Sequence, residues 1–149
     1  MNPTQHLQTI IIGGGVAGLA CAVDLVHAPQ KVLVIEAQRE LGGRFAAEKQ
    51  LIDEFIHFIE GHGGEIVTDT RVHALELKTD KNICWVKTEW GTIKAHNTIV
   101  TLSPSEQTKL KLPTNVPGLF RLQEDFDNLQ AATLAGQTLA DTVLANNSK

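Results

Sequence analysis

Three glycines at fixed spacing, Gly13, Gly15 and Gly18, constrain this chain more than any other feature. They separate a short β-branched run at residues 9–12 from an apolar series with helical spacing at residues 16–26. In a strand–turn–helix unit, the first glycine permits a tight turn and the second lets the backbone approach a pyrophosphate. The third lets the helix pack close to the strand. The pattern therefore predicts a phosphate-binding turn at the N-terminus of a helix.

A second apolar run, at residues 31–36, ends in an acidic residue, Glu36. Together with the preceding strand and helix it forms one βαβ unit. An acid at this position accepts hydrogen bonds from the ribose hydroxyls of a dinucleotide and repels the additional phosphate of NADP. We therefore expect Glu36 to bind an adenosine ribose.

A second glycine pair followed by arginine, Gly42-Gly43-Arg44, comes shortly after the acid. Such a turn would place backbone N–H groups and a guanidinium near the same pyrophosphate. A long dinucleotide such as FAD needs both turns, whereas a simple NAD site does not. The motif favours FAD, while the glycine spacing and Glu36 also permit an NAD-binding domain.

The rest of the chain alternates between further strands and helices, and we expect a single domain over residues 1–149. The predicted fold class is α/β: a Rossmann-like, doubly wound parallel sheet of about five strands, of the two-dinucleotide-binding-domain type. A small antiparallel β-meander replaces one crossover helix. Asp127 is the expected N-cap of the last helix. The expected elements after Arg44 are helices at 48–60 and 127–145, parallel strands at 65–68, 98–102 and 118–122, and meander strands at 72–77, 83–88 and 92–95.

Charge and hydropathy exclude several classes of function. The formal net charge is −4 and no run of lysine or arginine occurs, which argues against binding to nucleic acid or to an anionic membrane surface. Residues 10–26 are apolar, but glycines and Asp24 interrupt them, so we expect no membrane span. Residues 1–6 lack a positively charged segment, and we expect a cytoplasmic protein without a secretory signal.

Reactive side chains do not form a recognisable catalytic or metal-binding set. Cys21 and Cys84 each lie in an apolar run and are expected to be buried, reduced thiols. His57 and His62 are too far apart along a helix to share one face, and no further ligand completes a metal site. We therefore assign no catalytic residue and no metal ligand.

Residues 9–44 resemble the N-terminal FAD-binding segment of the flavin-dependent amine oxidase and phytoene desaturase superfamily, and residues 58–77, 97–104 and 117–140 extend the likeness. The resemblance implies FAD as cofactor. It implies that the backbone of Val72 contacts the adenine, that Asp125 binds the ribityl and phosphate region, and that the last helix points its N-terminus at the flavin. The implied cofactor-binding residues are Gly13, Gly15, Val16, Ala17, Gly18, Glu36, Ala37, Arg39, Gly42, Gly43, Arg44, Val72, Asp125, Leu129 and Gln130.

Two departures from the family pattern shape the hypotheses. Only residues 45–47 stand where the family has a long substrate-binding region, and Glu124 replaces a glycine that lies against the cofactor. One hypothesis is an FAD-binding domain whose redox chemistry is carried by the flavin. A partner chain or a second copy would then cover the exposed flavin and apolar faces near Phe45, Phe55 and Phe58. The alternative is a non-catalytic, minimal or degenerate dinucleotide-binding domain, with weak FAD or NAD binding, that acts through a partner chain.

Overall fold

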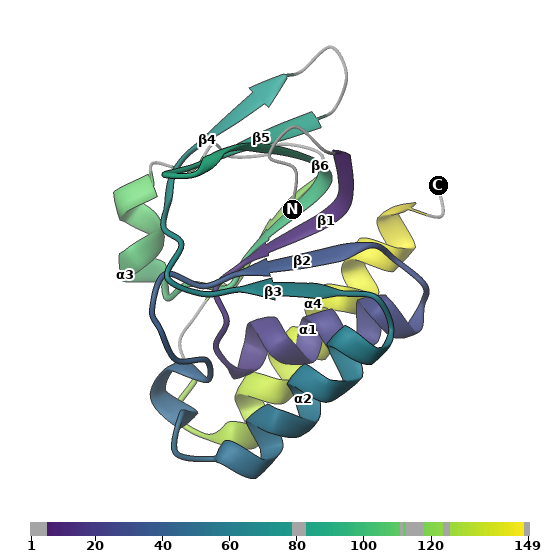
Figure 1. Ribbon diagram of the computed structural model, residues 1–149, viewed down its shortest axis with the longest axis vertical. Helices are drawn as coiled ribbons and strands as arrows, with labels where there is room; N and C mark the ends of the chain where they lie inside the picture. The colour runs from purple at the N-terminus through teal and green to yellow at the C-terminus, as the bar shows by residue number, and fades with distance from the viewer. Residues whose placement is uncertain (1–5, 79–82, 111, 113–117, 124–125, 148–149) are drawn as a thin grey trace.

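The parallel part of the sheet has the strand order expected for a dinucleotide-binding fold. A computed structural model describes residues 6–78, 83–110, 112, 118–123 and 126–147. The chain order reverses on either side of β1, which confirms the predicted fold class. The parallel strands are β1 (His6–Ile12), β2 (Val32–Ile35), β3 (Glu65–Val67), β6 (Gly91–Val100) and β7 (Leu119–Arg121), in the order β3-β2-β1-β6-β7 (Figure 1).

Helices cover one side of these strands and the meander covers the other (Figure 1). The helices are α1 (Val16–His27), α2 (Lys49–Gly61) and α4 (Leu129–Asn147). Strands β4 (Val72–Lys78) and β5 (Ile83–Thr88) pair antiparallel with each other, and β5 pairs antiparallel with the first half of β6. The predicted meander is therefore present, and it supplies the second layer that a crossover helix would otherwise provide.

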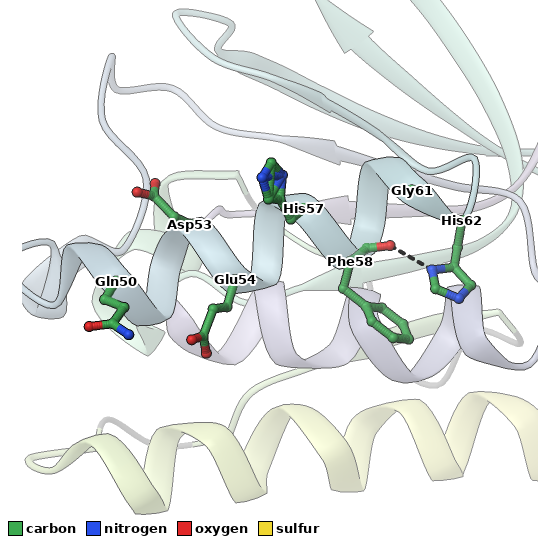
Figure 2. A pocket seen from close by; sticks show the side chains of 7 residues that line it. All are labelled: Gln50, Asp53, Glu54, His57, Phe58, Gly61 and His62. Carbon is green, nitrogen blue, oxygen red and sulfur yellow. Dashed lines mark hydrogen bonds between the residues drawn. The ribbon is translucent and has the colours of Figure 1, made fainter.

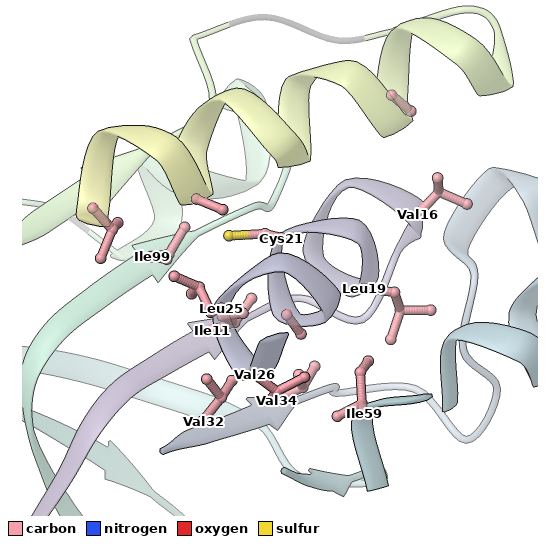
Figure 3. Packing of buried hydrophobic residues seen from close by; sticks show 14 of the residues in the cluster. Ile11, Val16, Leu19, Cys21, Leu25, Val26, Val32, Val34, Ile59 and Ile99 are labelled. Carbon is pink, nitrogen blue, oxygen red and sulfur yellow. The ribbon is translucent and has the colours of Figure 1, made fainter. Parts of the chain in front are cut away.

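Alternating residues of the central strands feed two separate cores. Ile11 of β1, Val34 of β2 and Ile99 of β6 pack with buried residues of α1, as Figure 3 shows. Their neighbours Ile10 and Leu33 face the opposite side and pack with buried residues of β5 and β6. Because both faces are covered, the strands read as continuous apolar runs rather than as an alternating pattern.

Strand β6 is one continuous strand, whereas the sequence predicted two strands at 92–95 and 98–102. Residues 96–97 carry no glycine or proline, and Asn97 is buried with its amide 3.5 Å from the hydroxyl of Thr9 on β1. The first half of β6 pairs with β5 and the second half with β7, while β1 lies along its other edge. The two halves of β6 therefore differ in pairing partner, and the break predicted between them is absent.

Short elements at the ends of the strands were not predicted. They are η1 (Gly43–Phe45), α3 (Pro104–Gln107) and η2 (Thr108–Leu110). The last helix is capped by Asn128, whose Oδ1 accepts the Ala131 N–H at 2.8 Å. The prediction of Asp127 as N-cap was wrong, because this side chain instead lies 3.2 Å from the Arg44 guanidinium.

Both cysteines are buried and unpaired, as expected. Burial raises the pKa of each thiol, and the nearby Asp24 carboxylate contributes to the effect at Cys21. Neither thiol is therefore activated as a nucleophile. Within the described ranges, no helix combines the length and apolarity needed to cross a membrane.

Helix α4 packs on α1 through a glycine, Gly136, which is buried. A Cβ at this position would overlap the carbonyl oxygen of Ala17 and lie 3.0 Å from the backbone nitrogen of Cys21. The two helix backbones therefore approach more closely than any larger residue allows.

We predict that Gly136→Ala lowers the free energy of unfolding by about 1–3 kcal/mol, because the added methyl group overpacks the helix contact. The matched control is Gly61→Ala, at the end of α2, where a Cβ would meet nothing within 4 Å. The control should be neutral or stabilising by up to about 1 kcal/mol. Urea unfolding followed by circular dichroism measures both, and equal effects of the two substitutions would contradict the packing argument.

The charged form of the Asp24 side chain, on α1, is disfavoured in the folded protein. Partial burial and then the neighbouring Asp141 carboxylate raise its pKa, while His27 acts in the opposite direction. A carboxyl group with a raised folded-state pKa binds its proton more tightly in the folded state. Its ionisation therefore removes stability as the pH rises from the unfolded-state pKa through the folded-state value.

Asp24→Asn should raise the midpoint of thermal unfolding at pH 7, because it removes a partly desolvated charge and its repulsion by Asp141. The gain should shrink as the pH is lowered towards about 4, the ordinary pKa of an aspartate carboxyl. Thermal melts across this pH range test the prediction. A gain that is constant with pH would show that the substitution acts through something other than charge.

Candidate functional site

The first glycine turn joins the carboxyl ends of three strands. The Gly13 N–H donates to the Ile35 carbonyl oxygen at 2.8 Å, and the Thr101 hydroxyl lies 3.0 Å from the Gly13 carbonyl oxygen, to which it donates. Gly13 has φ +113°, and a Cβ there would lie 2.6 Å from Thr101 Oγ1. Glycine is therefore required both by backbone conformation and by space.

The other two glycines of the motif have different environments. A Cβ at Gly18 would overlap the carbonyl oxygen of Gly13, so Gly18 is needed for α1 to approach the turn. Gly15 has an ordinary φ of −74°, and a Cβ there would meet nothing within 4 Å. The fold therefore does not require glycine at position 15. Instead, Gly15, Val16 and Ala17 leave open space at the N-terminus of α1, where N–H groups and the helix dipole favour an anion.

The second glycine pair lies directly against the first turn. The Gly42 N–H donates to the Gly14 carbonyl oxygen at 2.8 Å, and a Cβ at Gly43 would come no closer than 3.6 Å to Gly15 Cα. Both Gly42 and Gly43 have positive φ, at 106° and 57°. The open space at Gly15 is thus bordered by two glycine turns, as the sequence predicted.

The Glu36 carboxylate ties the end of β2 to the glycine turn. Its Oε1 accepts the Gly14 N–H and its Oε2 accepts the Gln38 N–H, each at 2.7 Å. A carboxylate has about four acceptor positions, so each oxygen can still accept a ribose hydroxyl. Glu36 therefore stabilises the glycine turn and can still accept hydrogen bonds from a ribose.

Arg44 connects the second glycine turn to the start of α4. Its Nη1 donates to the Phe126 carbonyl oxygen at 2.8 Å and lies 3.2 Å from Asp127 Oδ1. Both side chains are mostly exposed, so this ion pair contributes little to stability.

Two cavities adjoin the glycine turns. One, of about 100 Å³, includes Gly13, and the other, of about 350 Å³, includes Gly15. Glu106 lines both. The smaller cavity is lined by Ile12, Gly13, Ile35, Ala37, Thr70, Arg71, Val72, Leu102, Glu106 and Lys109. The larger is lined by Gly15, Val16, Ala17, Gly42, Gly43, Arg44, Phe45, Thr101, Ser103, Glu106, Leu122, Phe126 and Ala132.

The structure thus brings most of the predicted cofactor-binding residues together around the two cavities. Gly18 packs against the first glycine turn, and Glu36 accepts a hydrogen bond from it. Arg39 instead lines a separate hollow with Lys49 and Ile52. Leu129 packs against the core between the sheet and the helices, which contains Ile11 and Ile99 and is called the helix-side core below. Gln130 is exposed, and neither residue lines the two cavities. Asp125 and Glu124 lie outside the described residues.

Sequence reasoning missed the contribution of the segment after β6. Thr101, Ser103 and Glu106 line the larger cavity. The buried Gln107 side chain donates to the Leu102 and Leu122 carbonyl oxygens, at 2.8 and 2.9 Å, and so holds this segment to the chain after β7. The only sequence signal was position, since residues at the carboxyl ends of parallel strands line ligand sites in such folds.

A further hollow, of about 770 Å³, runs along α2 (Figure 2) and shares no lining residue with the two cavities at the glycine turns. There His62 Nδ1 lies 2.8 Å from the Phe58 carbonyl oxygen, and the two rings stack 4.0 Å apart. No group of three or more metal-ligating side chains occurs in the described part of the chain.

The phenylalanines expected on exposed apolar faces, Phe45, Phe55 and Phe58, are partly buried against the helix-side core. Among the described residues, Trp90 (73% exposed) and Leu134 (62% exposed) are the large hydrophobic side chains that face solvent.

Comparisons with known proteins agree with this geometry. Residues 11–82 match the family of NAD(P)-binding Rossmann-like domains. L-amino acid dehydrogenase of Synechocystis is 37% identical over 83 residues, which cover 56% of this chain and 17% of that protein. The 15-cis-phytoene desaturase of Arabidopsis thaliana is 44% identical over 48 residues, covering 32% and 8%. Lysine-specific histone demethylase 1 homolog 3 of Oryza sativa is 45% identical over 48 residues, covering 32% and 6%.

Solved structures share the fold at low sequence identity. THI4 of Thermovibrio ammonificans superposes with a TM-score of 0.79 at 12% identity, covering 97% of this chain and 91% of that one. A thioredoxin reductase from Gloeobacter violaceus superposes with a TM-score of 0.54 at 16% identity, covering 66% and 37%.

The fold, the two glycine turns and the family match together indicate a dinucleotide-binding domain of the Rossmann type. Within this class, the resemblance to the amine oxidase and phytoene desaturase-like flavoproteins is confirmed by the named relatives. The matched residues span less than a fifth of the length of each of these three relatives.

We predict that Gly15→Ala and Gly18→Ala differ in how strongly they lower stability. Gly18→Ala should lower the free energy of unfolding by about 1–3 kcal/mol or more, because the methyl group collides with backbone. Gly15→Ala meets open space, so it should cost at most about 1 kcal/mol, from the poorer helix cap. Urea unfolding without nucleotide compares the two. A large loss of unfolding free energy for Gly15→Ala would contradict the open space at this position.

Proposed function

We propose that this domain binds FAD across the two cavities. The observation that supports it most directly is the open space at Gly15, bordered by Gly43 and lying at the N-terminus of α1. A pyrophosphate suits this space, because free N–H groups and a helix dipole stabilise its charge. Glu36 would hold the adenosine ribose, and the smaller cavity, which includes Ala37 and Val72, would take the adenine end.

The second glycine turn and the larger cavity favour FAD over NAD. Gly42 and Gly43 line the larger cavity together with Phe45, Leu122 and Phe126. Apolar and aromatic walls of this kind suit a flavin better than a charged nicotinamide ring. OTEMO, a protein of the same fold (TM-score 0.55, 18% identity, covering 63% of this chain and 25% of that one), was solved in an FAD-bound form.

Arg44 would assist the pyrophosphate after a change of partner. Its exposed ion pair with Asp127 is weak, so a phosphate can compete for the guanidinium. The exchange would release the link between η1 and the start of α4.

When bound, the flavin would supply the redox chemistry by accepting a hydride from a substrate. The residues of this chain would bind and orient the cofactor, and we assign none of them a catalytic role. We further propose that a second copy of this chain or a partner chain covers the larger cavity, where the flavin would lie.

A second candidate function is NAD binding, or weak dinucleotide binding by a degenerate domain that acts through a partner. It is supported by the description of the matching family as NAD(P)-binding. Glu36, at the ribose position, favours NAD over NADP in that case.

FAD titration of the purified protein, followed by flavin fluorescence and by absorbance after desalting, tests the proposal. We expect near-stoichiometric binding by the wild type and at least about a tenfold loss for Gly15→Ala, because its methyl group occupies the phosphate space. Gly61→Ala is the control and should bind like the wild type. NAD should compete weakly.

A folded wild type that retains no flavin, and that binds NAD instead, would reject FAD in favour of the second candidate. Binding that is unaffected by Gly15→Ala would place the nucleotide elsewhere on the domain.

A further inference from the structure

Glu106 has an unusual position, because this residue lines both cavities of the proposed cofactor site. The other charged residues described in the lining are cations. Arg71 and Lys109 border the smaller cavity, and Arg44 borders the larger. Glu106 therefore offsets positive charge in both cavities at once.

The Glu106 carboxylate is held in place by the start of α3. The Ser103 hydroxyl donates to Glu106 Oε1 at 3.0 Å, and Ser103 Oγ accepts the Glu106 N–H at 3.4 Å. Ser103 is thus the N-cap of α3, and its hydroxyl also bonds the glutamate side chain and restrains it. Ser103 itself lines the larger cavity, so the restrained carboxylate stays beside the space assigned to phosphate.

We propose that Glu106 is a specificity-determining residue that limits the negative charge of the nucleotide this site accepts. The inference rests on the proposed function and deepens it. Glu36 discriminates at one ribose, whereas Glu106 acts on any phosphate placed in either cavity. The site then favours a dinucleotide with two phosphate charges over nucleotides with a longer or additional phosphate group.

The size of the effect follows from exposure. Glu106 is exposed, so water screens its repulsion of a phosphate. The interaction between two exposed charges changes a binding constant by about two- to fivefold. The effect of Glu106 on the binding constant should therefore grow with the number of phosphates on the nucleotide. Glu106 therefore tunes a preference among nucleotides rather than abolishing the binding of any one of them.

The test is Glu106→Gln, because glutamine keeps a side-chain oxygen that can accept the Ser103 hydroxyl while it removes the charge. Dissociation constants are measured by fluorescence or calorimetry for riboflavin, FAD, ADP and ATP, at low and at high salt. The control is Glu60→Gln on α2, an exposed site that changes the net charge equally but lines neither cavity.

We expect Glu106→Gln to leave riboflavin unchanged, to strengthen FAD about two- to fivefold and to strengthen ATP more than ADP. High salt should remove these gains, and Glu60→Gln should show none. If the wild type binds FAD and the two variants behave alike, Glu106 has no selective role and the proposed function stands. If FAD fails to bind while ADP and ATP gain affinity in Glu106→Gln, the proposed function fails and the charge limit stands. Absence of any nucleotide binding would overturn both.

Discussion

The close approach of α1 to the turn after β1 determines much of this structure. Gly18 lies so near the carbonyl oxygen of Gly13 that no side chain fits between them, and the hydroxyl of Thr101, directly after β6, donates to the same carbonyl oxygen. Helix, turn and two strand ends therefore share one contact region. Because α1 is fixed at its first turns, its N-terminus stays over the carboxyl ends of the strands, and the open space at Gly15 has a defined position.

Features set by neighbouring residues could be predicted from the sequence. The glycine spacing, the apolar runs of β1 and β2, and the helical spacing at residues 16–26 are local signals, and the corresponding elements are present. Features set by distant partners could not. The continuity of β6 depends on β5 and β7 pairing with its two halves, and the position of Glu106 beside both cavities depends on how α3 folds back after β6. No local pattern encodes either fact.

The meander has a consequence for the site as well as for the core. It covers the sheet face that carries Ile10 and Leu33, so both sides of the parallel strands are shielded without a second layer of helices. Its first strand begins at Val72, and this residue lines the smaller cavity. The element that completes the core thus also supplies a wall of the proposed adenine site, which links folding of the meander to nucleotide binding.

The short connection between the second glycine turn and α2 explains how the domain closes without the long region that the related family inserts there. Gly42 has a positive φ, and a Cβ on it would meet Ala46 and Ile52 at about 3 Å, so the turn lies directly against the start of α2. Ile52 and Ile59 then bury against the helix-side core. The contacts that hold α2 in place come from residues on both sides of the connection and from α1. The cradle at Gly15 and Gly43 therefore depends on the domain's own packing and needs no support from an inserted region.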